Sequence, residues 1–125
     1  MAKTAIPKPP SEYDFHRSVV GYLSKALDRN AMFFHSPNGG YRYATEAARL
    51  KSMGVIAGLP DVGVVYDGRI AWLELKAKRG RISAAQAYCH ARLTEAGTPV
   101  SVCRSLDDVE AALKAAGIPT RGRLN

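Results

Sequence analysis

The segment from Gly58 to Lys76, GLPDVGVVYDGRIAWLELK, constrains the fold of this chain more than any other. Two apolar runs, VGVVY and IAWLEL, stand on either side of the dipeptide Asp67-Gly68. An Asp-Gly pair between two β-prone runs is typical of a two-residue turn in which both central residues have positive φ. The segment therefore predicts a β-hairpin.

The position of this turn determines which residues of the two strands face each other. Counting outward from the turn pairs Val62 with Leu73 and places Asp61 across from Glu74. Directly opposed residues share one face of the sheet, with Cβ atoms roughly 4.5–5.5 Å apart. Because side chains alternate along a strand, Lys76 lies on that same face. The hairpin thus predicts two neighbouring carboxylates and a lysine at its open end.

Two carboxylates at this spacing repel each other and need a counter-charge. Lys76 supplies one, and a divalent cation supplies a stronger one, with oxygen ligands that suit Mg²⁺ or Mn²⁺. A metal ion bound beside a lysine can polarise a phosphate and activate water for attack on it. The alternative is a surface hairpin with solvated charges, in which Lys76 is a salt-bridge partner.

Six further elements are predicted around the hairpin. Capping residues, apolar spacing and glycine stops indicate helices from 12 to about 28 and over 45–53, 84–96 and 106–116, and strands over 31–34 and 99–103. This order favours an α/β fold with a central mixed β-sheet flanked by helices. At 125 residues we expect one domain over 11–118, preceded by a flexible arm at 1–10 and followed by a short basic tail at 119–125.

Two polar residues on the predicted helices are candidates for the same site. Glu12 shares a helical stripe with His16 and Leu23, and a carboxylate facing the core is costly unless it is paired or bound to metal. The alternative is a partly exposed glutamate in the first turn, favoured by the helix dipole. Gln86 begins the helix that must pack near the carboxylates. Alternatively, the run SAAQ at 83–86 is a capping box.

The charge of the chain favours a polyanionic partner. Eighteen Lys and Arg against eleven Asp and Glu give a net charge of +7, which suits nucleic acid first and an anionic membrane surface second, with an inert basic surface as the alternative. We expect no membrane span and no secretory signal. Cys89 and Cys103 lack a CxxC spacing, which predicts buried thiols in a reducing, cytoplasmic compartment and no zinc site.

The motifs together resemble the PD-(D/E)xK nuclease superfamily, and more closely the VRR-NUC family, especially its small stand-alone members found in phages. The resemblance rests on GLPD, on LELK with Glu74 thirteen residues after Asp61, on Gln86, and on Glu12 upstream. It also includes the segment FHSPNGGYRYATEAARLKSMGVIAGLPD and extends to about Asp108.

This resemblance implies a restriction-endonuclease-like core with helices on both faces of the sheet, and cleavage of DNA phosphodiester bonds with Mg²⁺ or Mn²⁺. The implied substrates are flaps, junctions and other branched DNA of repair or recombination. The implied metal ligands are Asp61, Glu74, the main-chain carbonyl of Leu75, and Glu12 directly or through water. Lys76 would position the attacking water, and Gln86 would orient Lys76 or that water.

One residue departs from the family pattern. His16 stands where the family often has a glutamine. A neutral imidazole can still donate a hydrogen bond or bind a metal ion, so we expect an auxiliary role. The alternative is an ordinary core histidine.

Basic and polar side chains beside this site are the expected DNA contacts. One group follows Lys76 in a charged turn and the other lies in the loop before the second predicted helix; they are Lys78, Arg79 and Arg81, then His35, Asn38, Tyr41 and Arg42. The alternatives are a solvated turn and a plain Asn-Gly turn. Arg121 and Arg123 would add general electrostatic contacts. We expect salt-dependent binding of low sequence specificity.

The expected protein is a metal-dependent, structure-selective DNA endonuclease without a small-molecule cofactor. Since one chain offers one site and two strands need two, we expect a homodimer. The alternatives are a catalytically inactive DNA-binding module of the same fold and a structural basic protein.

Overall fold

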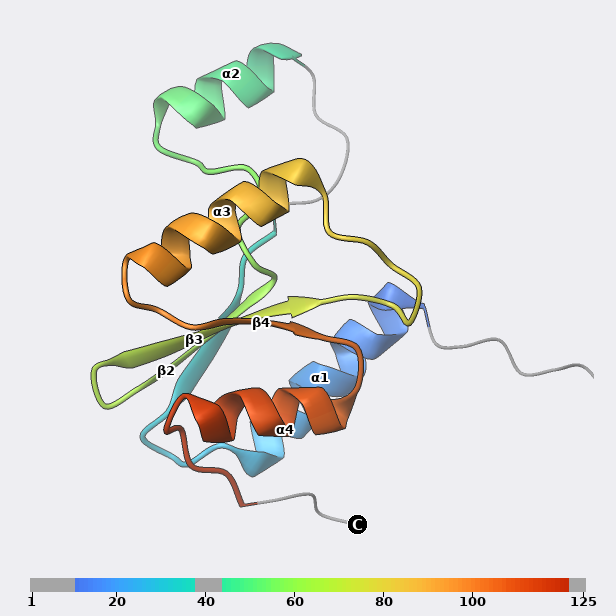
Figure 1. Ribbon diagram of the computed structural model, residues 1–125, viewed down its shortest axis with the longest axis vertical. Coiled ribbons are helices and arrows are strands. Elements are labelled where there is room, and N and C mark those ends of the chain that lie inside the picture. The colour runs from blue at the N-terminus through green and yellow to red at the C-terminus, as the bar shows by residue number, and fades with distance from the viewer. Residues whose placement is uncertain (1–10, 38–43, 122–125) are drawn as a thin grey trace, which may run out of the picture.

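The computed structural model describes residues 11–37 and 44–121. Within these ranges the elements are α1 (Glu12–Ala26), β1 (Met32–His35), α2 (Ala44–Ser52), β2 (Val62–Tyr66), β3 (Arg69–Leu75), α3 (Ala84–Glu95), β4 (Val100–Cys103) and α4 (Leu106–Ala115) (Figure 1). Their order and type are those predicted, with boundaries that differ by a few residues. The expected arm at 1–10, and Asn38, Tyr41, Arg42 and Arg123, lie outside the described residues.

The four strands form one mixed sheet in the order β1-β2-β3-β4. β1 and β2 are antiparallel, as are β2 and β3, whereas β3 and β4 are parallel. The parallel pair requires a crossover connection, and α3 provides it. The predicted α/β fold with a central mixed sheet is confirmed.

The hairpin has the predicted turn and register. Asp67 and Gly68 both have positive φ, 48° and 73°, as a primed turn requires. The pairing runs from the turn outward to Val62 opposite Leu73. The paired residues end at Val62, and Asp61, in the bend before β2, is still close enough to Glu74 to form a hydrogen bond with it.

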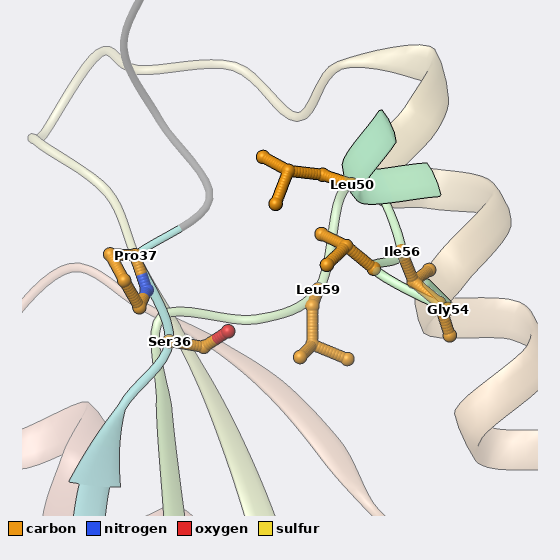
Figure 2. Close-up of a pocket in the computed structure, with 7 residues that line it drawn as sticks. Ser36, Pro37, Leu50, Gly54, Ile56 and Leu59 are labelled. Carbon is orange, nitrogen blue, oxygen red and sulfur yellow. The ribbon is translucent and has the colours of Figure 1, made fainter. Parts of the chain in front are cut away.

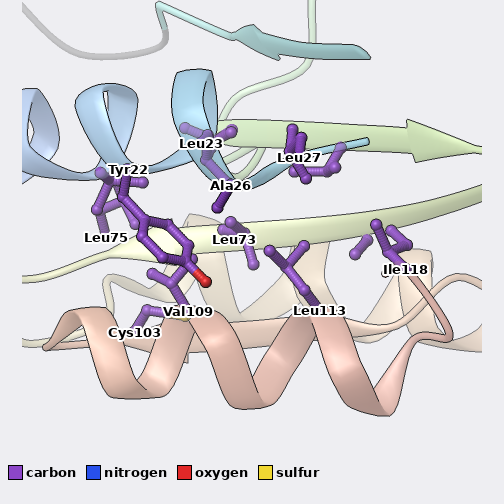
Figure 3. Close-up of a cluster of buried hydrophobic side chains, with 14 of the residues drawn as sticks. Tyr22, Leu23, Ala26, Leu27, Leu73, Leu75, Cys103, Val109, Leu113 and Ile118 are labelled. Carbon is purple, nitrogen blue, oxygen red and sulfur yellow. The ribbon is translucent and has the colours of Figure 1, made fainter. Parts of the chain in front are cut away.

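The hydrophobic core lies between the sheet and two helices. α1 and α4 cover the same face (Figure 1), and their apolar side chains interdigitate with those of the strands (Figure 3). Ser11 caps α1 by accepting a hydrogen bond from the main-chain N–H of Asp14 at 3.0 Å. The fully buried members of this core include Val19, Leu23, Val62, Val64, Leu73, Leu75, Cys103, Val109 and Leu113.

α3 covers the opposite face of the sheet (Figure 1), so helices lie on both faces as expected. On this face the rings of Phe34 and Trp72 meet edge to face, with centroids 5.8 Å apart. Gly63 lies between them in the pairing, and a Cβ atom there would overlap the Phe34 ring. A side chain at this strand position would therefore require the Phe34 ring to move.

α2 stands apart from the sheet, beyond α3 (Figure 1), and none of its side chains is buried. At the other end of the described chain, Thr120 bridges to Leu27, and the N–H of Arg121 donates to the carbonyl of Ala26 at 2.8 Å. Folded contacts thus extend beyond 118, the boundary expected from sequence. None of the described helices is long and apolar enough to span a membrane.

Candidate active site

Asp61 is held at the open end of the hairpin by three hydrogen bonds. Its carboxylate Oδ2 accepts from the main-chain N–H of Leu75 at 2.8 Å. Its main-chain carbonyl accepts from the N–H of Ser36 and from Nδ1 of His35, each at 2.8 Å. β1 and β3 therefore fix Asp61 from both sides.

Glu74 is buried beside Asp61, with only 1% of its surface exposed. Burial raises the pKa of Glu74 to about 9, and a hydrogen bond with Asp61 and the negative charge of Asp61 act in the same direction. The positive charge of Lys76 opposes this rise in pKa. Without a bound cation, Glu74 is therefore protonated at neutral pH, and the two carboxyl groups share one negative charge.

Lys76 is also buried, with 8% of its surface exposed. Its main-chain N–H donates to the carbonyl of Cys103 at 3.0 Å, which continues the β3–β4 pairing by one residue. Alternation along the chain places its side chain on the α3 face together with that of Glu74. The structure thus brings together the predicted trio of Asp61, Glu74 and Lys76.

A fourth side chain at this site, His90 of α3, was not predicted from the sequence. Its Nε2 is hydrogen-bonded to Oε1 of Glu74 at 2.9 Å. Burial lowers the pKa of His90, and the charge of Lys76 lowers it further. The signal was present in the spacing, because His90 follows Gln86 by four residues and so lies on the same helical face.

Gln86 does not face Lys76 as the functional interpretation expected. Its Oε1 accepts from the main-chain N–H of Ser83 at 2.9 Å, and its own N–H donates to the hydroxyl of Ser83. This is the complete capping box that the sequence offered as the alternative. The physical reason is position: at the third residue of the helix, a glutamine side chain reaches back to the cap more readily than across to the sheet.

Glu12, His16 and His35 border the site on its α1 side. Glu12 is exposed in the first turn, so the expectation of a core-facing carboxylate is wrong. Its charge still acts on His16 and on Glu74. The rings of His16 and His35 meet edge to face with centroids 4.4 Å apart. Burial and the neighbouring His35 lower the pKa of His16, against the effect of Asp61.

His35 was expected in the loop before the second helix, but it is the last residue of β1 and pairs with Val62. The strand extends one residue further than predicted, because the main chain of Asp61 offers a partner to both His35 and Ser36. His35 therefore supports the main chain of Asp61 through its Nδ1 atom.

The basic turn after β3 is pinned by an arginine that the sequence did not reveal. Arg104 follows β4, and its guanidinium donates to the carbonyls of Ala77 and Gly80 at 2.8 and 2.7 Å. The three basic residues of this turn are exposed to solvent; they are Lys78, Arg79 and Arg81. Because β3 and β4 are parallel, the residue after β4 necessarily lies beside the turn that follows β3.

An apolar pocket lies between the end of β1 and the segment that follows α2 (Figure 2). Leu59, two residues before Asp61, contributes to its wall. The other residues around it are Ser36, Pro37, Leu50, Gly54, Val55 and Ile56. Nearby apolar side chains are exposed, above all Met53 (71%) and Ile56 (57%).

The donors at the site suit a hard divalent cation. Among the described residues, no group of three or more His, Cys, Asp and Glu side chains is arranged to hold a metal ion. Asp61 and Glu74 supply two carboxyl groups, and a main-chain carbonyl such as that of Leu75 is the oxygen donor that such pairs add. Oxygen ligands of this kind suit Mg²⁺ or Mn²⁺ and do not suit a metal ion that prefers thiolate ligands. Cys89 and Cys103 are free and buried, as expected.

Comparison with known proteins supports the fold. No protein-family model and no curated protein matches the chain. Among solved structures, a chain described as "VRR_NUC domain protein" superposes with a TM-score of 0.70 and 22% sequence identity, over 87% of this chain and 89% of that chain. The restriction-endonuclease-like fold expected from the VRR-NUC resemblance is thereby confirmed.

Proposed function

We propose that this chain is a metal-dependent DNA endonuclease of the VRR-NUC type. The observation that carries the proposal is the contact between Asp61 and Glu74, with the buried Lys76 on the same face, at the open end of the hairpin. Two carboxyl groups that share a proton and lie beside an ammonium group provide both a cation site and a counter-charge for a phosphate. A VRR_NUC domain protein with the same fold supports a nuclease over other uses of such a site.

The residues would divide the chemistry among them. Asp61, Glu74 and the main-chain carbonyl of Leu75 would hold Mg²⁺ or Mn²⁺, with Glu12 contributing through water because it is exposed. The ion supplies polarisation of the scissile phosphate and a lowered pKa for its bound water. The Lys76 ammonium group orients the attacking water and offsets the negative charge that develops on the phosphate oxygens.

The basic turn would bind the DNA strand on either side of the cleaved bond. Lys78, Arg79 and Arg81 are exposed and anchored close to Lys76 by Arg104, so their charges can neutralise neighbouring phosphates. Such contacts carry no base information, and this agrees with selection of branched or flapped DNA by shape. His35 lies at the same end of the sheet, but its Nδ1 is already committed to Asp61.

Cleavage assays test this function directly. Supercoiled plasmid, linear duplex, a 5′ flap and a four-way junction are incubated with the protein in Mg²⁺, in Mn²⁺ or in EDTA. We expect cutting only with metal, with the branched substrates cut fastest. Lys76→Ala should lower the rate by about 10²–10³-fold, because it removes a charge that acts mainly in the transition state. Lys114→Ala, a change at an exposed lysine of α4, is the control.

The alternatives predict different results in the same assays. A catalytically inactive DNA-binding module gives metal-independent shifts of the junction in a gel and no cleavage of any substrate. A structural basic protein cuts no substrate with any metal ion, and its Asp61→Asn variant shows no loss of function. Cutting that survives Lys76→Ala would contradict the proposal.

A further inference from the structure

We propose that His90 is a positioning residue that holds the carboxylate of Glu74 in the orientation needed to bind the metal ion. This inference rests on the proposed function and extends it to a residue outside the motif. The Nε2 atom of His90 lies 2.9 Å from Oε1 of Glu74. Both side chains are shielded from water, with 1% of Glu74 and 14% of the His90 side chain exposed.

The direction of this hydrogen bond follows from the chemistry of the partners. An ionised carboxylate can only accept, so Nε2 of His90 must carry the proton when Glu74 is a metal ligand. The hydrogen bond to Oε1 restricts rotation of the Glu74 carboxylate. The other oxygen, Oε2, is not used by His90. Partners of this kind orient ligands and tune their affinity for metals.

α3 is itself fixed relative to both acidic residues, which makes His90 a rigid support. The capping box at Ser83 and Gln86 holds the first turn of the helix. Gly58, three residues before Asp61, packs so tightly on this turn that a Cβ atom would overlap the main-chain carbonyl of Ala85. The first turn of α3 therefore contacts the segment that leads to Asp61, and His90 of the same helix contacts Glu74.

The other polar side chains around Glu74 have different roles. Asp61 is hydrogen-bonded to Glu74, but it is itself an expected metal ligand. Gln86 is one turn earlier on the helix, but its side chain is used in the capping box. Lys76 acts on Glu74 through its charge. Of the residues that border Glu74, His90 thus has the geometry of a support, and it is absent from the sequence motif.

A pair of amide variants separates the hydrogen bond from simple packing. Glutamine places an amide N–H₂ near the position of Nε2, whereas asparagine carries the same group on a side chain one methylene shorter. We expect His90→Asn to weaken Mn²⁺ binding by about 10- to 100-fold and His90→Gln to keep it within roughly threefold. Mn²⁺ affinity is measured by calorimetry on the full chain, and thermal unfolding in EDTA confirms that each variant folds.

The control is Arg92→Gln, at an exposed position on the same helix, which should leave Mn²⁺ affinity unchanged. Equal affinity in wild type and His90→Asn would overturn the inference alone, and so would equal losses in both His90 variants. A wild-type protein that binds neither Mn²⁺ nor Mg²⁺ would overturn the proposed function and this inference together. If His90→Asn fails to fold, weak binding by a folded His90→Gln likewise contradicts the role.

Discussion

Glu74 is the residue at which folding and function oppose each other most directly. Folding places this carboxyl group in a buried position next to a second carboxyl group, and both effects raise its pKa, to about 9. In an unfolded chain the same group ionises near 4.5. Between these two values the folded protein holds one proton more than the unfolded chain, so the stability of the metal-free protein must fall as the pH rises.

We therefore predict that the free energy of unfolding decreases by on the order of 1 kcal/mol per pH unit between pH 7 and 8 in EDTA. His16 and His90 have lowered pKa values and affect stability with the opposite sign. Their effect falls mainly below the ordinary histidine pKa of about 6.5, so it offsets only a small part of the decrease between pH 7 and 8. Glu74→Gln carries an amide that cannot ionise, and it should remove most of the slope. Urea titrations at pH 7.0, 7.5 and 8.0 measure both proteins. Parallel slopes in the two would contradict the assignment of the proton to Glu74.

The acidic pair could be predicted from the sequence because strand pairing is a counting problem once the turn is known. Asp67-Gly68 fixed the register, and the register placed Asp61 beside Glu74. The spacing from Gln86 places His90 on the same helical face, but the contact of His90 with Glu74 could not be derived in this way. Which side chain of a helix reaches a given atom of the sheet depends on how the helix is rotated and shifted, and no local pattern sets those values. For Gln86, two local patterns competed, and the capping box is what the structure contains.

At the scale of elements, the site depends on how closely α3 packs on the segment that precedes Asp61. Gly58 has a φ of 82°, and a Cβ atom there would also overlap the main chain at Ala85. Gly97, which ends α3, has a similar φ of 94° but nothing within 4 Å of its Cβ position. The two glycines share the backbone requirement and differ in the steric one.

Substituting alanine at each position separates the two requirements. Gly97→Ala should cost about 1–2 kcal/mol of folding free energy, the strain of a left-handed backbone conformation with a Cβ atom. Gly58→Ala should cost about 3 kcal/mol or more, because the helix must also move away from the loop. Urea denaturation gives both values. Since the loop leads to Asp61, Gly58→Ala should weaken Mn²⁺ binding too, and equal costs at the two glycines would argue against tight packing here.

At the scale of the whole molecule, the order of elements and the mixed sheet followed from capping residues, apolar periodicity and turn signals, which are local. The part that did not follow is the arrangement around α2. Its residues have helical spacing, but none of them is buried, because the helix lies beyond α3 and away from the sheet (Figure 1). Sequence periodicity reports a helix but does not report what it packs against. The apolar side chains that follow α2 are left exposed in the single chain.

A second copy of the chain is the partner that the proposed reaction calls for, because cutting two strands at a junction requires two sites. We predict a homodimer with twice the 13.5 kDa mass of the chain, measured by light scattering, in which the apolar residues after α2 are covered. Ile56→Lys should then give a monomer that still cuts one strand of a duplex. Met32→Lys is the matched control, since it places the same charge on a side chain of similar exposure, 63% against 57%, at the edge of the sheet. A wild-type monomer that cuts both arms of a junction in one binding event would rule out the need for a dimer. If Met32→Lys dissociates the dimer and Ile56→Lys does not, the interface lies at the β1 edge and not at the segment after α2.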